Sequence, residues 1–273
     1  MLNFFNYIGG KKYMLKYILK LLDYSKYCYI ELFGGSGKVL LNKPMHKVEI
    51  YNDRDGDIFN LWYVCKYKFD EFKKELDDLI YCEDLFKYFK NLKPENDVMR
   101  AVRTYYLFNC SISGIGDVFS TGYVRNQSLS LMNKIENLRN IFERIKYVQI
   151  LNKDFRRILE SIKNKDSVML YADPPYYGTE HYYEGFSRED HVVLADYLNK
   201  AKYSVIVSYY YFDDIERLYP RGKWKYYEII STKHSAVTRP THENVQKTKA
   251  VELLLVNYNV KNNLNLGLIE EHD

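Results

Sequence analysis

Residues 30–37 read Ile30-Glu31-Leu32-Phe33-Gly34-Gly35-Ser36-Gly37, and this stretch decides the fold class. Its apolar beginning continues a run that starts at Tyr27 and predicts a strand, whereas its glycines predict a tight turn before a short helix over residues 38–42. A strand, a glycine turn and a helix in this order are typical of an open α/β sheet, in which ligands bind where the strand ends. Glycine suits such a turn because it adopts positive φ readily and lets the backbone approach a ligand closely.

The surrounding sequence repeats this alternation of strands and helices. Helices are predicted over residues 13–22, from about residue 58 to 65, and over residues 188–200. Strands are predicted over residues 48–51, 148–151, 168–172, 205–209, 226–230 and 251–258. Alternating elements of this length predict an α/β fold, with a doubly wound sheet and helices on both of its faces.

The pattern changes between residues 67 and 146, where Lys- and Asp-rich helical stretches predominate. A helix is predicted after Pro94, a Gly- and Ser-rich loop or hairpin over residues 110–130, and one further helix over residues 131–145. We interpret residues 67–146 as an inserted domain, and residues 1–66 together with 147–273 as the catalytic domain. Residues 262–273 are expected to form a loosely packed tail.

Composition narrows the class of protein without deciding its function. The chain has 273 residues, 47% of them hydrophobic, and its net charge of +4 permits a polyanionic partner without requiring one. No stretch is long and apolar enough for a membrane span, and the first residues lack the pattern of a signal peptide, so we expect a cytoplasmic protein that does not bind membranes. The four cysteines form no C-x-x-C pair, so neither a disulfide framework nor a metal site is expected.

The glycine turn favours S-adenosylmethionine over a nicotinamide dinucleotide as the cofactor. A dinucleotide-binding turn would place another glycine three positions after Gly37, where this chain has Leu40. S-adenosylmethionine carries no phosphate, so the shorter glycine pattern suits it.

Two carboxylates follow predicted strands and are candidate cofactor contacts. Asp53 ends the second strand, where its two oxygens can accept hydrogen bonds from both ribose hydroxyls; a solvated turn is the alternative. Asp154 and Phe155 follow another strand and could contact the adenine of the cofactor, or Asp154 could simply cap a helix.

The segment Asp173-Pro174-Pro175-Tyr176 follows the apolar strand at residues 168–172 and predicts methylation of an adenine amino group. This amine is a poor nucleophile because its lone pair is delocalised into the ring. The Asp173 carboxylate and the Pro174 carbonyl, which Pro175 holds in place, can accept both of its N–H bonds, and Tyr176 can stack on the base. Neither a metal nor a covalent intermediate is needed for this direct displacement. The alternative is a rigid proline turn.

With these motifs the chain resembles the Dam-type DNA adenine-N6 methyltransferases. Tyr7-Ile8-Gly9-Gly10-Lys11, the glycine motif from Phe33 to Gly37, Asn52-Asp53, Asp154-Phe155, Asp173 to Tyr176 and the stretch from Glu252 to Tyr258 follow in that family's order. The resemblance implies a Rossmann-like seven-stranded methyltransferase sheet with a helical target-recognition insertion. It also implies cofactor contacts from residues Tyr7, Lys11, Phe33, Gly34, Gly35, Gly37, Asp53, Asp154, Phe155 and Asp173.

The insertion departs from the family pattern, which often has N-R-T-x-F-N where this chain reads Asn109-Cys110-Ser111-Ile112-Ser113-Gly114. The recognition sequence in DNA therefore stays open. Tyr123 could wedge into a base step and Arg125 could contact guanine or a phosphate, although an ordinary surface hairpin explains them equally well. Arg100 and Arg103 could contact phosphates or could instead form ion pairs within their helix.

The motif order as a whole predicts a site-specific enzyme that flips an adenine out of double-stranded DNA and methylates its N6 atom. Methylation of RNA adenine, or nucleic-acid binding without catalysis, are the alternatives. Cytosine-N4 methylation is disfavoured because Asp173, rather than a serine, begins the catalytic motif. A cognate restriction endonuclease is a possible further partner in the same system, without a stable complex.

Overall fold

A computed structural model describes residues 1–9, 11, 13–122, 126–179, 186–231, 250–260 and 270–272. The chain packs into two compact units: unit 1 comprises residues 1–12 and 34–152, and unit 2 comprises residues 13–33 and 153–273. Packing thus groups the predicted insertion, residues 67–146, with the glycine turn and the N-terminal segment. The functional division into a catalytic and a target-recognition domain stays a prediction.

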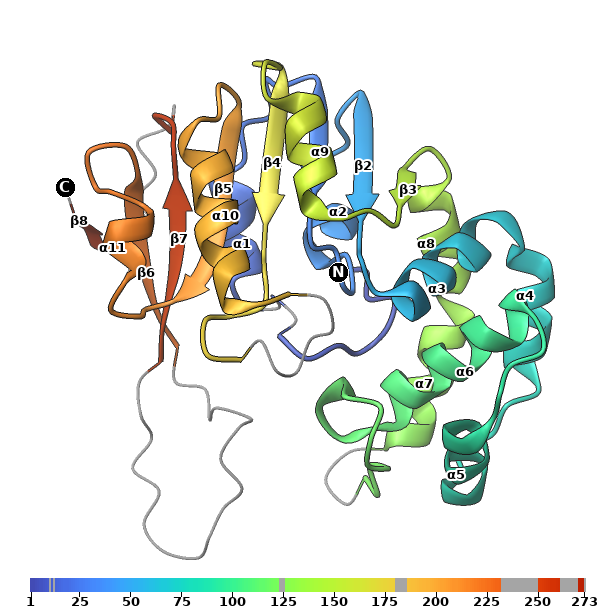
Figure 1. Cartoon of the computed structure of the whole chain (residues 1–273). Coiled ribbons are helices and arrows are strands. Elements are labelled where there is room, and N and C mark those ends of the chain that lie inside the picture. Colours follow the sequence, from blue (N-terminus) through green and yellow to red (C-terminus); the bar gives the residue numbers. More distant parts are fainter. Residues whose placement is uncertain are drawn as a thin grey trace, which may run out of the picture. The chain divides into compact units, whose positions relative to one another are not determined.

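Unit 2 is built on a mixed sheet with helices on both faces. The strands lie in the order β1 (Cys28–Glu31), β4 (Val168–Ala172), β5 (Ser204–Tyr210), β7 (Ala250–Val256), β6 (Lys225–Ser231) and β8 (Glu270–His272). The first three strands are parallel, whereas β7 runs antiparallel to both β5 and β6. Helices α9 (Phe155–Ile162) and α10 (Arg188–Asn199) cover one face and α1 (Leu15–Leu21) covers the other, while α11 (Ile215–Leu218) contacts α10 (Figure 1).

Burial explains why the central strands of unit 2 are continuous apolar runs. All five residues of β4, Val-Met-Leu-Tyr-Ala, are buried, as are the first six of the seven residues in β5. Parallel strands covered by helices on both faces lose the alternation of apolar and polar residues. The predicted strand at 168–172 is confirmed at both of its ends, and Asp173 therefore stands directly after a rigid, buried strand.

Unit 1 contains two parallel strands and a group of helices. The strands are β2 (Val48–Asn52) and β3 (Gln149–Leu151), paired with Tyr51 opposite Ile150. The helices are α2 (Lys38–Asn42), α3 (Gly56–Tyr67), α4 (Phe69–Asp77), α5 (Glu83–Asn91), α6 (Asp97–Cys110), the 3₁₀ turn η1 (Ile112–Gly114), α7 (Gln127–Glu136) and α8 (Leu138–Ile145).

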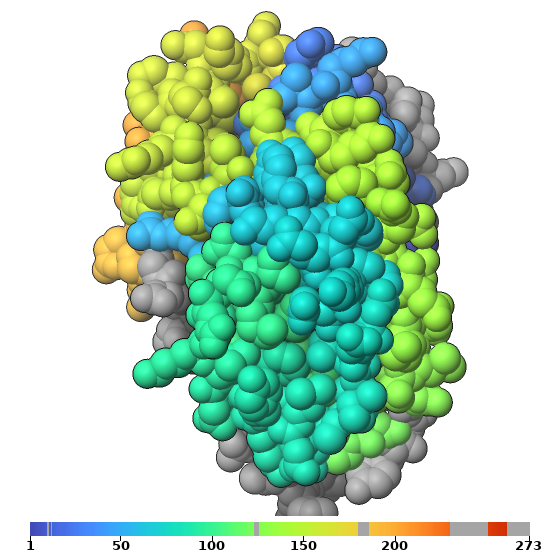
Figure 2. All heavy atoms as spheres, turned by 90° about the vertical axis from the view of Figure 1, so that its right-hand side faces the viewer, coloured from blue at the N-terminus to red at the C-terminus, as the bar shows by residue number. Residues whose placement is uncertain are grey.

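Helix α6 is the centre of the helical group, because α3, α4, α5 and α7 all pack against it. The side chains that the sequence assigns to its inner face, Val98, Ala101, Val102 and Tyr105, are all buried. Residues from α4 to α6, coloured cyan to green in Figure 2, form a continuous outer surface of unit 1. The predicted helix after Pro94 is confirmed.

Two elements differ from the prediction made from the sequence. The single helix expected over residues 131–145 is two helices, which meet at Asn137. The side-chain amide of Asn137 donates to the Asn133 carbonyl, so this side chain competes with the backbone for helical hydrogen bonds. The tail expected to pack loosely contributes β8, which pairs with β6 over residues 270–272; residues 262–269 lie outside the described residues. The α/β class is confirmed.

None of the helices among the described residues is long and apolar enough to cross a membrane.

Candidate active site

The glycine turn of unit 1 is closed by the backbone and by two buried aromatic side chains. Gly34 donates its amide to the Asn52 carbonyl at 2.8 Å, and Gly37 donates to the Gly34 carbonyl at 2.8 Å. The Gly35 carbonyl accepts hydrogen bonds from the Tyr51 hydroxyl at 2.6 Å and from the Trp62 indole at 3.1 Å. Because this carbonyl is held by both rings, the turn has one defined shape.

The turn needs glycine for steric as well as conformational reasons. Gly35 and Gly37 have φ of +49° and +62°, in the left-handed region that side chains disfavour. A Cβ atom on Gly34 would lie 2.1 Å from the Tyr51 ring, and one on Gly37 would lie 2.4 Å from the Trp62 ring. The glycines predicted to contact the cofactor therefore let the turn pack against two aromatic residues of its own unit.

Asp53 directly follows strand β2 and forms a hydrogen bond with the glycine turn. One carboxyl oxygen of Asp53 accepts the Gly35 amide at 2.7 Å and the other accepts the Asp55 amide at 2.9 Å. Burial raises the pKa of Asp53 from 3.8 to about 6, although both backbone hydrogen bonds act in the opposite direction. The carboxyl is thus fixed in orientation and retains lone pairs for a ligand, as a ribose-binding role requires.

The residues of the N-terminal motif are held by the helices of unit 1. The Tyr7 ring packs edge-on against Phe108 at 5.5 Å, and it would lie 2.9 Å from a Cβ atom on Gly35. The backbone amide of Asn6 donates to the side-chain oxygen of Asn109 at 3.1 Å. The Lys134 ammonium donates to the side-chain oxygens of both Asn6 and Asn109 at 2.8 Å. Tyr7 therefore lies next to the glycine turn.

This arrangement gives the unusual segment from Asn109 to Gly114 a structural role that the sequence did not reveal. A Cβ atom on Gly114 would lie 2.6 Å from the Asn6 backbone, so η1 also packs closely against the N-terminal segment.

Two lysines of unit 1 lie out of full contact with solvent. Lys11 is buried, with its ammonium 3.4 Å from the Gly9 carbonyl. Burial lowers the pKa of Lys134 from 10.5 to about 8.

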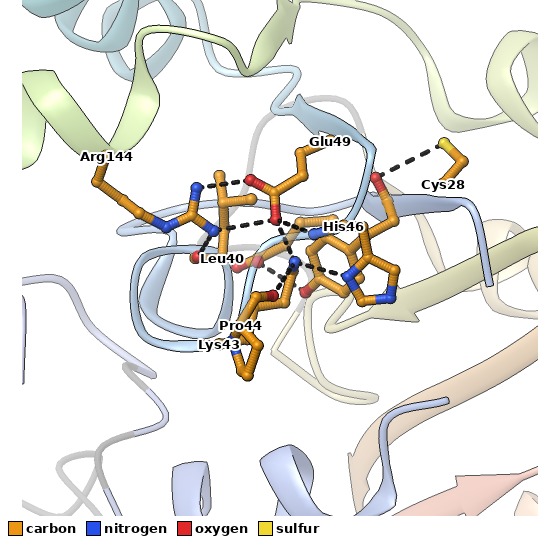
Figure 3. Close-up of polar contacts among 9 residues, drawn as sticks. Cys28, Leu40, Lys43, Pro44, His46, Glu49 and Arg144 are labelled. Carbon is orange, nitrogen blue, oxygen red and sulfur yellow. Dashed lines mark hydrogen bonds and ion pairs between the residues drawn. The ribbon is translucent and has the colours of Figure 1, made fainter. Parts of the chain in front are cut away.

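A buried ionic cluster, which no sequence pattern indicated, anchors strand β2 just before Asp53 (Figure 3). Arg144 on α8 donates to Glu49 on β2 at 2.5 Å and 3.0 Å, and also to the Leu40 carbonyl. Lys43 pairs with the same Glu49 carboxylate and bonds the His46 ring at 2.9 Å. Although burial opposes it, contact with Arg144 and Lys43 lowers the pKa of Glu49.

In unit 2, the segment Asp173 to Tyr176 leaves the carboxyl end of β4. Asp173 and Tyr176 are half-buried, and the Tyr176 carbonyl accepts the amide of Thr179 at 2.8 Å and its hydroxyl at 2.6 Å. The Tyr176 ring meets the Tyr210 ring edge-on at 4.5 Å. The hydrogen-bonded turn thus spans residues 176–179, after the two prolines, and the catalytic role of the segment from Asp173 to Tyr176 stays a prediction.

Three phenylalanine rings form a second feature of unit 2. The ring centroids of Phe33, Phe155 and Phe186 lie 5.7 Å to 5.8 Å from one another. Phe33 and Phe155 were predicted cofactor contacts, whereas no cofactor contact was predicted for Phe186. Only the fold brings Phe186 to the other two, because it belongs to none of the cofactor motifs.

Asp154 has the structural role that the sequence left open. Its carboxylate accepts the Arg156 amide at 3.0 Å and so caps α9, and it pairs with the Arg156 guanidinium at 3.1 Å. The same guanidinium also pairs with Asp190. Contact between Asp154 and a cofactor stays a prediction.

Comparison with known sequences assigns the family. The sequence model of the D12 class N6 adenine-specific DNA methyltransferases matches residues 7–238. The chain belongs to this family. The resemblance that the motifs indicated is thereby confirmed, and methyl transfer to adenine in DNA is the reaction of the family. Among solved structures, a Haemophilus influenzae protein provisionally named a methylase is similar at 10% identity, over 91% of this chain and 88% of its own, with a TM-score of 0.33.

The predicted DNA-binding residues have different outcomes in this family member. Arg100 donates to Asp57 of α3 at 2.5 Å, and Arg103 lies 3.6 Å from the same carboxylate. The ion pairing that the sequence suggested within one helix therefore joins two helices, and phosphate contact by these arginines stays a prediction. Tyr123 and Arg125 lie outside the described residues. Among the described residues, no group of three or more His, Cys, Asp or Glu side chains could hold a metal ion.

Proposed function

We propose that this chain transfers a methyl group from S-adenosylmethionine to N6 of an adenine flipped out of double-stranded DNA, at a specific sequence. The observation that carries the proposal is the motif Asp173 to Tyr176, fixed at the end of a buried strand, in a chain whose family acts on adenine in DNA. Specificity, flipping and the identity of the methyl donor go beyond what the family alone establishes.

The residues proposed to hold the cofactor are those that the motifs indicate. They are Tyr7, Lys11, Phe33, Gly34, Gly35, Gly37, Asp53, Asp154, Phe155 and Asp173. The glycine turn fits a ligand without phosphates, because the amides of Gly34, Gly35 and Gly37 already donate within the protein and so are not free to bind a phosphate. Phe33, which is half-buried, offers apolar ring surface suited to an adenine, and the buried Phe155 packs against it.

The bound cofactor would supply an electrophilic methyl group, and the protein would supply orientation. The Asp173 carboxylate and the Pro174 carbonyl accept the two N–H bonds of the target amine, which frees its lone pair for attack. Tyr176 stacks on the flipped base and replaces the stacking that the base loses in the duplex, where unpairing costs about a few kcal/mol. Pro175 fixes the backbone between these two groups.

Sequence recognition is proposed to come from residues 67–146, and to include phosphate contacts by Arg100 and Arg103 and groove contacts by Tyr123 and Arg125. Because Arg100 and Arg103 share the Asp57 carboxylate, binding to a phosphate would require one of them to exchange partners. A cognate restriction endonuclease acting on the same sequence is the proposed functional partner.

The proposal is tested by incubating the protein with tritiated S-adenosylmethionine and matched unmethylated DNA and RNA duplexes, followed by sequencing of modified sites. We expect label in DNA, confined to adenines within one short sequence. Label in RNA alone would replace the DNA proposal, and label spread over unrelated sequences would contradict site specificity. Cofactor binding without transfer to any nucleic acid would favour a binding protein without catalysis.

A further inference from the structure

A buried acidic side chain on β7 faces the catalytic motif, although the reaction proposed above does not use it. Glu252 is 6% exposed and lies in register with Tyr210 of β5 on one side and Ile229 of β6 on the other. Its carboxylate accepts a hydrogen bond of 3.0 Å from the Tyr176 hydroxyl. The two residues are 76 positions apart in the sequence, so only the sheet brings them together.

The surroundings of this hydrogen bond keep its donor and acceptor roles fixed. Burial, and after it the negative charges of Asp173 and Glu252, raises the pKa of Tyr176 well above its ordinary value. The Tyr176 hydroxyl therefore keeps its proton and can donate a hydrogen bond to Glu252. A charged acceptor makes such a bond about twice as strong as one between neutral groups.

The ring of Tyr176 is restrained at its edge as well as at its hydroxyl. Tyr210 meets this ring at an interplanar angle of 73°, with centroids 4.5 Å apart. The edge contact limits sideways movement, whereas the hydroxyl bond limits rotation about the χ angles of Tyr176. Both restraints come from neighbouring positions on β5 and β7, because Tyr210 and Glu252 are a cross-strand pair.

We propose that Glu252 is a positioning residue, which acts through the Tyr176 hydroxyl to hold the ring in the orientation that stacks on the target base. This inference rests on the proposed function, in which Tyr176 carries that stacking. Glu252 itself touches neither the base nor the cofactor in this scheme. An orientation held before the base arrives lowers the entropy cost of reaching a reactive geometry, so its loss lowers kcat more than it raises KM.

The proposal is tested with a double-mutant cycle on Glu252 and Tyr176, measured as single-turnover methylation of a cognate DNA duplex. Glu252→Met removes the acceptor at similar volume, and we expect the rate to fall roughly ten-fold, as for the loss of one hydrogen bond to a charged group. Glu252→Gln keeps a neutral oxygen acceptor and should recover part of the rate. Tyr176→Phe keeps the ring and should lose about as much as Glu252→Met.

The decisive quantity is the effect of Glu252→Met in the Tyr176→Phe background. If Glu252 acts through the hydroxyl, the double variant is no slower than either single variant. Equal losses in both backgrounds, or an unchanged rate in Glu252→Met, would overturn the proposal. If Glu252→Met does not fold, the same cycle is run with Glu252→Gln and judged by the same criterion.

The matched control is Tyr226→Phe, because Tyr226 is another buried phenol of the sheet, and its hydroxyl donates to the Tyr219 carbonyl at 2.6 Å. This variant should leave the methylation rate unchanged, which shows that loss of a buried hydroxyl alone does not slow methylation.

A second readout uses DNA with 2-aminopurine at the target position, because the fluorescence of this base on binding reports that it is flipped out of the duplex. Wild-type protein that methylates no DNA would refute the proposed function, whereas active wild type with an additive cycle refutes only the role of Glu252.

Discussion

Asp53 gives the sharpest test of the cofactor site, because its two oxygens already accept one backbone amide each. About four lone-pair positions belong to a carboxylate, so two remain for the two ribose hydroxyls. Asp53→Asn replaces one oxygen with a donor, which would face either the Gly35 or the Asp55 amide, or a ribose hydroxyl. Loss of the charge and of one acceptor should cost about 3 kcal/mol, or roughly a 100-fold increase in the Kd for S-adenosylmethionine.

The pKa of Asp53 adds a signature that a merely structural role would not produce. Folding raises this pKa from 3.8 to about 6, so the folded chain holds the proton more tightly than the unfolded chain. The contribution of this group to stability is therefore fully present below pH 3.8 and lost as the pH rises through 6. Ribose hydroxyls donate to the ionised form, so cofactor affinity should fall up to about ten-fold for each pH unit below 6.

The assay is isothermal titration of the protein with S-adenosylmethionine between pH 5 and pH 8. We expect the affinity of wild type to be constant above pH 7 and to weaken below pH 6, and that of Asp53→Asn to be weak without this step. Titration of the cofactor itself is common to both proteins and cancels in their ratio. Asp55→Asn is the control, since Asn caps α3 as well as Asp55 does.

Two results would refute the reasoning. One is an Asp53→Asn protein that binds S-adenosylmethionine within about three-fold of wild type, because loss of the charge and of one acceptor should cost more than that. The other is a wild-type affinity without any step near pH 6. The Asp55→Asn control should keep its affinity and shift the step to slightly lower pH, because the Asp55 charge helps to raise the pKa of Asp53.

Three further perturbations test the packing around the site. Gly37→Ala should lower the free energy of unfolding by about 2–4 kcal/mol in urea titration, from positive φ and contact with Trp62; Gly222→Ala, with open space around it, should not. Lys134→Met should remove a pH dependence of stability. Folding lowers the pKa of Lys134 from 10.5 to about 8, so the stability of wild type relative to this variant should rise from pH 8 to 10.5. Parallel curves of stability against pH for the two proteins would contradict this. Arg144→Met leaves Glu49 buried with less compensation and should cost about 3 kcal/mol, against less than about 1 kcal/mol for exposed Arg139→Met, by thermal unfolding.

The elements that the sequence predicted well are those with a strong local signal. The helix at residues 38–42 and the strand at 168–172 agree at both ends. Gly37 and Pro44 bound the helix, and a polar stretch and the motif from Asp173 bound the apolar strand. Periodicity found the buried face of α6 for the same local reason. The break at Asn137 was missed since apolar spacing continues across it from Ile135 to Leu138.

The candidate site was predicted where it depends on short motifs and missed where it depends on pairs distant in sequence. Asp53 and Tyr176 belong to motifs, but their partners Gly35 and Glu252 could not be paired with them from spacing. Similarly, Arg100 pairs with Asp57, 43 positions away on another helix, and no pattern marks Lys134 as half-buried. Side-chain partners across a sheet or between helices follow from the tertiary fold, which periodicity does not contain.

The central claim is that Asp173 directs methyl transfer to adenine N6, and nucleoside analysis tests it most directly. Unmethylated genomic DNA is incubated with S-adenosylmethionine and either wild type or Asp173→Ala, digested to nucleosides and analysed by mass spectrometry. The account predicts N6-methyl-2′-deoxyadenosine with wild type, and at least about a 100-fold lower rate of its formation with Asp173→Ala. Methylated cytosine as the product, or undiminished N6-methylation by Asp173→Ala, would contradict it.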